Sequence, residues 1–266
     1  MASLDKVFKL IDVLASRSEP FGLTELATVA GLDKGTTHRL LEALIGHGYV
    51  NRSMDSPKYE LSLKLWTLGS RVVADRSVMT LSRSYMERLV KLTGETVYLT
   101  ICDNLEAVYM ARIDSPRLVR AHTPMGGRVP LHSGSTGRAL LAHLPEEEIE
   151  RVCERLTKFT ENTITDKATL LLELERIRSN GYAISVGEWE LSISGVAAPI
   201  FGHDRRVVAS LGVTGPVDRL SGSRLKELGP CVAEAALELS EELGYHPPST
   251  SRTAIVKVKD RLPKMA

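Results

Sequence analysis

Residues 23–50 read LTELATVAGLDKGTTHRLLEALIGHGYV and contain two helical patterns separated by a very short turn. Thr24 is placed to cap the first helix, and Gly31 is placed to end it. Apolar residues then recur at helical spacing over residues 34–47, which predicts a second helix. Two helices joined by such a tight turn are typical of a helix-turn-helix.

The flanking sequence extends this motif on both sides. Residues 3–17 carry a helical apolar pattern that Ser3 is placed to cap, and the Pro-Phe-Gly segment after it breaks that helix. Residues 49–52 and 59–62 alternate like strands around a segment of turn-forming residues. The order of helix, helix, turn, helix and hairpin predicts a winged helix-turn-helix.

A winged helix-turn-helix binds double-stranded DNA by placing the start of its second motif helix in the major groove. Threonine hydroxyls there can reach phosphates or base edges, and an arginine can make two hydrogen bonds to guanine. Taken alone, these side chains would more often be ordinary surface residues, but the hairpin supplies a second contact with the DNA backbone or the minor groove. The expected DNA-binding residues are Lys34, Thr36, Thr37, His38 and Arg39 of the helix and Asn51, Arg52 and Lys58 of the wing.

Charge does not by itself favour binding to DNA. The chain has a formal net charge of +1, and residues 1–65 contain eight acidic and eight basic side chains. Affinity must therefore depend on where the basic groups lie. Because one copy would make few phosphate contacts, we expect a homodimer or a dimer of dimers that presents several copies to spaced half-sites.

Length and composition describe an ordinary globular protein of more than one domain. The chain has 266 residues, of which 43% are hydrophobic and 25% charged. Its three cysteines and its scattered histidines predict no disulfide framework, metal site or cofactor. No apolar stretch is long enough to span a membrane and the start does not resemble a signal peptide, so we expect a cytoplasmic protein.

The rest of the chain predicts helices over an antiparallel sheet, which makes the fold class α+β. Strands are expected over residues 96–102, 107–113, 118–123, 196–201 and 207–214, and helices over residues 64–92, 134–143, 145–154, 166–180 and 221–243. Either Thr165 or Asp166 is placed to cap the helix ending at Asn180. The basic residues after 246 form no core pattern; we expect a flexible tail, and contact of this tail with DNA phosphates is the less favoured alternative.

The stretches LDKVFKLIDVLA, LTELATVAGLDKGTTHRLLEALIGHGYV and YELSLKLWTLG resemble the start of the IclR family of bacterial transcriptional regulators. The stretches PMGGRVPLHSGSTGRALLAHLPEEEI and GYAISVGEWELSISGVAAPIFGHDRRVVASLGVTGP resemble two regions of that family's effector-binding domain. The resemblance implies a GAF-like C-terminal sheet with flanking helices, a dimer of dimers and a small-molecule effector. The expected divisions are residues 1–64 for the DNA-binding domain, 65–80 for a linker helix, 81–246 for the effector-binding domain and 247–266 for the tail.

The first expected wall of the effector site is the glycine-rich segment over residues 130–138. A helix start with free amides and hydroxyls favours a carboxylate, and the resemblance implies that this segment lines the effector pocket. The spacing alone favours ordinary helix capping, and the resemblance reverses that preference. The expected effector-binding residues here are His132, Ser133, Ser135, Thr136 and Gly137.

Residues 185–195 form the second expected wall. Glu188 is the acid we expect nearest the ligand, although acids in a polar segment are usually solvated surface charges. Ser194 and Gly195 complete the set, and the small size of Gly195 leaves room for a larger ligand. The choice between an aliphatic and an aromatic acid stays open.

We therefore expect a ligand-responsive regulator, more specifically a repressor, of a catabolic operon, and not an enzyme. Two alternatives are a DNA-binding architectural protein with a sensor domain and a hydrolase-like enzyme with an accessory helix-turn-helix. The hydrolase needs a nucleophile paired with a base. Ser133 beside His132 provides no such geometry by spacing alone, and the sequence has no G-x-S-x-G elbow.

Overall fold

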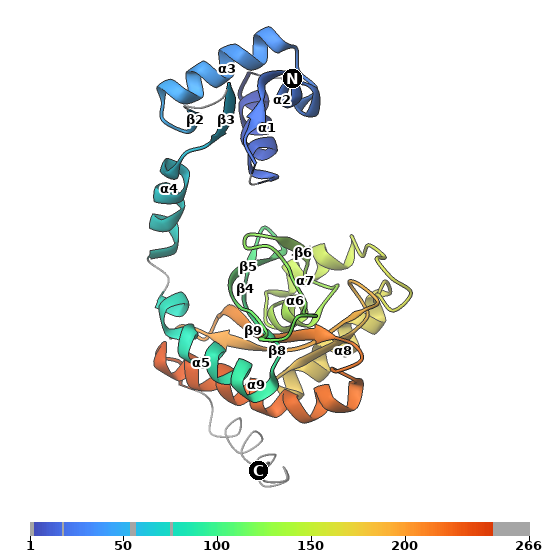
Figure 1. Cartoon of the computed structure of the whole chain (residues 1–266). Helices are drawn as coiled ribbons and strands as arrows, with labels where there is room; N and C mark the ends of the chain where they lie inside the picture. Colours follow the sequence, from blue (N-terminus) through green and yellow to red (C-terminus); the bar gives the residue numbers. More distant parts are fainter. Residues whose placement is uncertain (1–2, 18, 54–56, 75–76, 247–266) are drawn as a thin grey trace. The chain divides into compact units, whose positions relative to one another are not determined.

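The computed structural model describes residues 3–17, 19–53, 57–74 and 77–246, which form two compact units (Figure 1). Unit 1 comprises residues 1–76 and unit 2 residues 77–266. The tip of the expected wing, residues 54–56, and the expected flexible tail, residues 247–266, lie outside the described residues.

Unit 1 contains a helix-turn-helix followed by a hairpin. Its elements are α1 (Ser3–Ala15), β1 (Phe21–Gly22), α2 (Leu23–Ala30), α3 (Lys34–Gly46), β2 (Val50–Arg52), β3 (Lys58–Leu61) and α4 (Leu63–Ala74). Gly31 ends α2 in the left-handed conformation, with φ of 61°. The Asp33 side chain caps α3 by accepting a hydrogen bond from the Thr36 N–H at 2.8 Å.

Two local predictions in unit 1 are wrong. Helix α2 begins at Leu23 after Gly22, so Thr24 is not its cap. Phe21 and Gly22 were expected to be a plain break, but they form strand β1, which pairs with β3. The strand forms because of tertiary packing. Phe21 is 3% exposed and lies in the core of unit 1 with residues such as Leu26 and Leu41.

The helical pattern expected over residues 64–92 corresponds to two helices in the described part of the chain. Helix α4 ends at Ala74 in unit 1, and helix α5 (Ser77–Thr93) begins unit 2. Residues 75 and 76 lie outside the described part of the chain.

Unit 2 is a six-stranded antiparallel sheet with helices on both faces. After α5 its elements are β4 (Thr96–Asp103), β5 (Glu106–Ile113), β6 (Arg128–Pro130), α6 (Ser135–Leu141), α7 (Glu146–Cys153), α8 (Lys167–Asn180), β7 (Ala183–Val186), β8 (Ile193–Phe201), β9 (Val207–Pro216) and α9 (Gly222–Glu242). The strand order is β6-β5-β4-β9-β8-β7. Asp166, one of the two expected caps, caps α8.

The strand expected over residues 118–123 is not formed. Leu118 is 96% exposed, and the Ala121 carbonyl accepts hydrogen bonds from the side chains of Thr96 and Tyr98 instead of joining a ladder. The strand next to β5 is β6, which pairs Val129 with Ala107. The alternation over residues 118–123 therefore reflects contacts with one end of β4 and not strand pairing.

Two apolar cores cover the two faces of this sheet. Helices α5 and α9 lie together on one face (Figure 1) and bury residues such as Leu89, Val213 and Val232. Helices α6, α7 and α8 bury the other core, which includes Leu140 and Leu174. Alternation along β8 sends successive side chains to opposite cores.

Gly229 on α9 marks a close approach to an aromatic ring. A β-carbon at this position would lie 2.3 Å from the Tyr182 ring, whereas one at Gly222 on the same helix would meet nothing within 4 Å. Only a hydrogen at position 229 therefore leaves room for Tyr182.

We expect Gly229→Ala to lower the free energy of unfolding of unit 2 by about 1–3 kcal/mol, the usual cost of overpacking a core. Denaturant unfolding of the full chain measures this, with Gly222→Ala as the control that leaves stability nearly unchanged. Combining Gly229→Ala with Tyr182→Ala should cost less than the sum of the two single changes. Additive costs would contradict the packing argument.

Candidate functional site

Helix α3 presents a polar edge at its N-terminal end. Lys34, His38 and Arg39 are exposed, and Thr36 is half-buried. His38 faces Glu42 one turn away, with the ring Nε2 3.7 Å from the carboxylate. This edge can reach a phosphate backbone or base edges without rearrangement of the helix.

Thr37 does not belong to that edge. It is fully buried, and its hydroxyl donates a hydrogen bond to the Asp33 carbonyl at 2.9 Å. The expectation that Thr37 contacts DNA is therefore corrected: this threonine faces the core of unit 1. The two consecutive threonines divide their roles because successive helix positions point about 100° apart.

The hairpin carries the remaining expected DNA contacts on exposed positions. Asn51 and Arg52 lie on β2, and Lys58 begins β3. Tyr59, which follows Lys58 on β3, is buried and fixes the hairpin to the core. Unit 1 thus presents two basic edges, one on α3 and one on the hairpin.

Unit 2 contains a cavity of about 530 Å³ beside the start of α6. This volume lies in the range that holds a small metabolite. The lining residues come from β5, the segment after it and β6, from the start of α6 and the residues before it, from β7 and the β7–β8 connection, and from the end of β9 and the residues after it. They are Tyr109, Val119, Arg120, Ala121, His122, Thr123, Val129, Ser133, Gly134, Ser135, Thr136, Ser185, Trp189, Glu190, Ser192, Ile193, Thr214, Pro216, Val217 and Asp218.

Ser133, Ser135 and Thr136 line this cavity from the glycine-rich segment. The Ser133 hydroxyl donates to the Pro130 carbonyl at 2.9 Å, and the Thr136 carbonyl accepts from Ser210 of β9 at 2.9 Å. The Tyr109 side chain forms a hydrogen bond with the Thr136 side chain. Burial raises the pKa of Tyr109, against a smaller lowering by that hydrogen bond. These contacts fix a wall of hydroxyl groups against the sheet.

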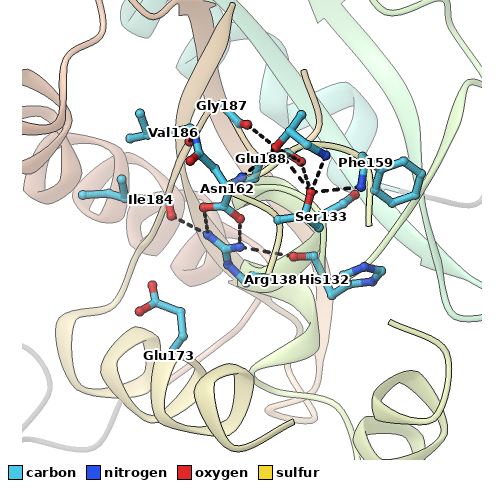
Figure 2. Close-up of polar contacts among 12 residues, drawn as sticks. His132, Ser133, Arg138, Phe159, Asn162, Glu173, Ile184, Val186, Gly187 and Glu188 are labelled. Atoms are coloured by element: carbon cyan, nitrogen blue, oxygen red, sulfur yellow. Dashed lines mark hydrogen bonds and ion pairs between the residues drawn. The ribbon is translucent and has the colours of Figure 1, made fainter. Parts of the chain in front are cut away.

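Glu188 does not face that cavity. Its carboxylate forms a buried bidentate ion pair with Arg138 of α6, whose side chain is 1% exposed (Figure 2). The Arg138 guanidinium also donates to the carbonyls of Ile184 at 2.5 Å and His132 at 3.2 Å. This acid joins the β7–β8 connection to α6, and the cavity lining gives no support to its expected place nearest the ligand.

His132 does not line this cavity either. Its ring Nε2 lies 2.9 Å from the Thr157 carbonyl oxygen. Because a carbonyl only accepts hydrogen bonds, Nε2 carries the proton and donates it. Burial lowers the pKa of His132, against a smaller rise caused by that hydrogen bond. Burial therefore favours the neutral form of His132, and its ring lies outside the cavity lined by Ser133 and Ser135.

The three remaining expected residues are Gly137, Gly195 and Ser194. The two glycines make room for neighbouring groups, and Ser194 lies on the face of β8 away from the cavity. A β-carbon at Gly137 would lie 2.5 Å from the Leu131 carbonyl, and one at Gly195 would lie 2.9 Å from the Ser135 hydroxyl. Gly195 therefore admits Ser135 and does not enlarge the cavity. Ser194 follows the alternation of β8 away from Gly195 and is buried on the α5 and α9 side.

Sequence reasoning missed the cationic side of the cavity. Arg120 and His122 line it, and Arg112 stands behind them, donating to His122 Nδ1 at 3.0 Å. Arg112 and Arg120 share the single carboxylate of Asp114, at 2.9 Å and 3.8 Å. Positive charge is therefore in excess here. Arg120 and His122 belong to residues 118–123, which were expected to be a strand, so no spacing rule could place them at a ligand.

The cavity lining also contains acidic and aromatic side chains. Glu190 and Asp218 line it, with the Glu190 carboxylate accepting from the Ser192 hydroxyl at 2.8 Å. The Trp189 ring lies 4.4 Å from that of Phe159. The cavity thus combines a cationic side, a wall of hydroxyl groups and an acceptor side.

Among the described residues, no group of three or more histidine, cysteine, aspartate or glutamate side chains could hold a metal ion. No helix in the described part of the chain is both long and apolar enough to cross a membrane.

Comparisons with known proteins cover both units. The family profile described as "IclR helix-turn-helix domain" matches residues 3–53, and that described as "Bacterial transcriptional regulator IclR C-terminal" matches residues 70–241. The chain is 30% identical over 246 residues to the transcriptional repressor IclR of Escherichia coli K12, covering 91% of this chain and 90% of that protein.

Solved structures show the same fold. The crystal structure of the Thermotoga maritima IclR has a TM-score of 0.77 and 29% identity, and covers 91% of this chain and 99% of its own. An IclR homologue from Microbacterium hydrocarbonoxydans, complexed with 4-hydroxybenzoate, has a TM-score of 0.77 at 24% identity over 91% of this chain and 99% of its own. The α+β architecture with an N-terminal helix-turn-helix is thereby confirmed.

We expect Arg138→Met to lower the free energy of unfolding of unit 2 by about 3–5 kcal/mol, because it leaves the buried Glu188 carboxylate unpaired. The matched control is Arg206→Met, which removes an arginine that is 87% exposed and paired with Asp204 at 3.7 Å. That change should cost less than about 1 kcal/mol.

Calorimetric unfolding of the full chain compares these variants. The double variant Arg138→Met/Glu188→Gln should be more stable than Arg138→Met alone, because no buried charge is then left without a partner. Equal effects of Arg138→Met and Arg206→Met would show that the pair does not hold the β7–β8 connection.

Proposed function

The chain belongs to the IclR family of bacterial transcriptional regulators, and on this basis we propose that it represses a catabolic operon whose expression a small organic acid controls. The observation that carries the proposal is the polar cavity of unit 2, in a chain whose other unit is a helix-turn-helix. The relatives are named regulators, so the hydrolase alternative is not favoured.

In the proposed DNA complex, α3 lies in the major groove and the hairpin contacts the flanking backbone or minor groove. All of the predicted DNA-binding residues except Thr37 are exposed or half-buried, which supports their proposed contacts with DNA. The proposed DNA-binding residues are Lys34, Thr36, His38, Arg39, Asn51, Arg52 and Lys58. The even charge balance of residues 1–65 supports a dimer or a dimer of dimers, because several weak contacts must add together.

In the proposed ligand complex, the carboxylate of the ligand lies toward Arg120 and His122. Positive charge is in excess there, because Arg112 and Arg120 share the single carboxylate of Asp114. Glu190 and Asp218 only accept hydrogen bonds when ionised, so they favour a ligand that also carries a hydroxyl group. Helix α6 has only seven residues, so its dipole contributes little and the hydroxyls of Ser133, Ser135 and Thr136 supply the wall. We therefore propose a small hydroxy acid as effector.

The regulatory step we propose is a change in operator affinity when the acid fills the cavity. Linkage requires the acid to prefer one of the two DNA-binding states. The chain continues from unit 2 to unit 1 through α5 and α4, which is the covalent route for such coupling. A DNA-binding repressor of this kind works in the cytoplasm.

Arg39→Ala is expected to weaken operator binding by roughly tenfold or more and to lower the slope of log affinity against log salt by about one. The probe is a duplex that the wild-type chain selects from a random library, measured by fluorescence anisotropy at several salt concentrations. Lys158→Ala removes the same charge from an exposed site on unit 2 and should leave both quantities unchanged. Equal effects of the two variants would place the DNA elsewhere.

A thermal-shift screen of the full chain tests the ligand class with pairs that differ by one hydroxyl: 4-hydroxybenzoate against benzoate, and lactate against propionate. A ligand that binds only the folded state raises the melting temperature of unit 2. We expect the hydroxylated member of at least one pair to produce the larger rise, and Arg120→Gln to abolish it. If none of the four acids changes the melting temperature, the proposed ligand class is wrong.

A further inference from the structure

Glu95 is a buried carboxylate that two arginines from distant segments share. It is 1% exposed and lies directly after Gly94, where α5 passes into β4. Arg219 donates to both of its oxygens, at 2.5 Å and 2.8 Å, and Arg117 donates to one at 3.1 Å. Arg117 precedes β6 and Arg219 follows β9, so one acid joins two parts of the chain about 100 residues apart.

The first of these parts, residues 114–123, forms one wall of the cavity. Its residues 119–123 line the cavity. The segment is held at the α5–β4 junction by Ser115, whose hydroxyl donates to the Gly94 carbonyl at 2.6 Å. Farther along, the Thr123 N–H donates to the Tyr98 hydroxyl of β4 at 2.9 Å.

The second part, residues 214–220, forms the adjoining wall. Thr214, Pro216, Val217 and Asp218 line the cavity. Gly215 makes room for the acid, because a β-carbon there would lie 2.6 Å from a Glu95 carboxylate oxygen. Arg219 also donates to the Val119 carbonyl at 2.8 Å, which ties this wall to the first.

Neither Glu95 nor its two arginines line the cavity; their neighbours do. The pKa of Arg219 is raised, chiefly by its hydrogen bond with Glu95, as expected for a charge held by its partner. Glu95 also lies two residues after Thr93, whose hydroxyl accepts from the Glu95 N–H at 3.2 Å and donates to Leu89 of α5 at 2.7 Å. Movement of either wall therefore acts on the end of α5.

We propose that Glu95 is the positioning residue of the effector cavity: with Arg117 and Arg219 it holds both walls and the end of α5 together, so that closure of the walls on a ligand is transmitted to α5. This inference rests on the proposed ligand-binding function of the cavity. It assigns Glu95 no contact with the ligand. Its role is to keep the two walls in the binding geometry before the ligand arrives.

Glu95→Gln tests the proposal, because glutamine keeps the size of the side chain and removes its charge. Hydrogen–deuterium exchange of the full chain without ligand should show faster exchange in residues 114–123, in residues 214–220 and in the last turn of α5. Arg117→Gln should also speed exchange in residues 214–220, which it does not contact. The control is Glu106→Gln, which removes an exposed ion pair with Arg128 in the same unit and should change exchange only near β5 and β6.

Isothermal titration with 4-hydroxybenzoate and with lactate gives a readout that a merely stabilising residue would not move. In Glu95→Gln the acid that binds the wild type should bind roughly tenfold more weakly at a temperature where both proteins are folded. Unchanged affinity and exchange confined to the Glu95 backbone would overturn the proposal while leaving the proposed function intact.

The two proposals can fail separately. If the wild type binds neither acid, the ligand class is wrong, and the exchange experiment alone decides whether Glu95 joins the two walls. If Glu95→Gln does not fold, Arg117→Gln decides the same question, because Arg117 is half-exposed and its loss leaves Glu95 paired with Arg219.

Discussion

The close packing of α6 on the sheet is the constraint on which the functional part of unit 2 depends. Glycine at position 212 of β9 leaves room for Thr136, since a β-carbon there would lie 2.5 Å from the Thr136 methyl group. Gly195 of β8 does the same for Ser135. This approach puts the hydroxyls of α6 into the cavity, and Arg138 of the same helix pairs with Glu188. The cavity wall and the buried ion pair are two results of one packing arrangement.

Buried charges then fix the segments around the cavity that have little regular structure. Arg138 holds the β7–β8 connection through Glu188, and Glu95 holds the two segments that contain Arg117 and Arg219. Each arrangement leaves the neighbouring residues free to face the cavity. Buried ion pairs often add little net stability, but removing one partner is costly, so they restrict the chain to one geometry. That restriction suits a site that must be formed before its ligand binds.

Local rules predicted the helix-turn-helix well, because its features are set by neighbouring residues. Gly31 ends one helix through its left-handed conformation, and the start at Lys34 follows from the Asp33 cap. Of the residues that the family resemblance implied on the first wall of the effector site, Ser133, Ser135 and Thr136 line the cavity, whereas His132 and Gly137 do not. Burial was harder to predict: Thr36 and Thr37 are chemically alike, and only the packing of α3 decides that Thr37 faces inward.

The rest of the site depends on long-range contacts that no spacing shows. Arg138 lies 50 residues before Glu188, and without the fold Glu188 is indistinguishable from a solvated loop acid. Residues 118–123 alternate like a strand, yet their polar groups bond to side chains of β4 and their cations reach the cavity. A pattern records which side chains are buried, but it does not record the element that buries them.

Coupling between the cavity of unit 2 and the DNA-binding edge of unit 1 is the central claim, and reciprocity tests it most directly. The dissociation constant of the bound acid should be measured for the full chain, free and saturated with its selected DNA duplex. The account predicts that DNA weakens acid binding by the same factor by which the acid weakens DNA binding. Equal affinity of the acid for the free and the DNA-bound protein would contradict the account.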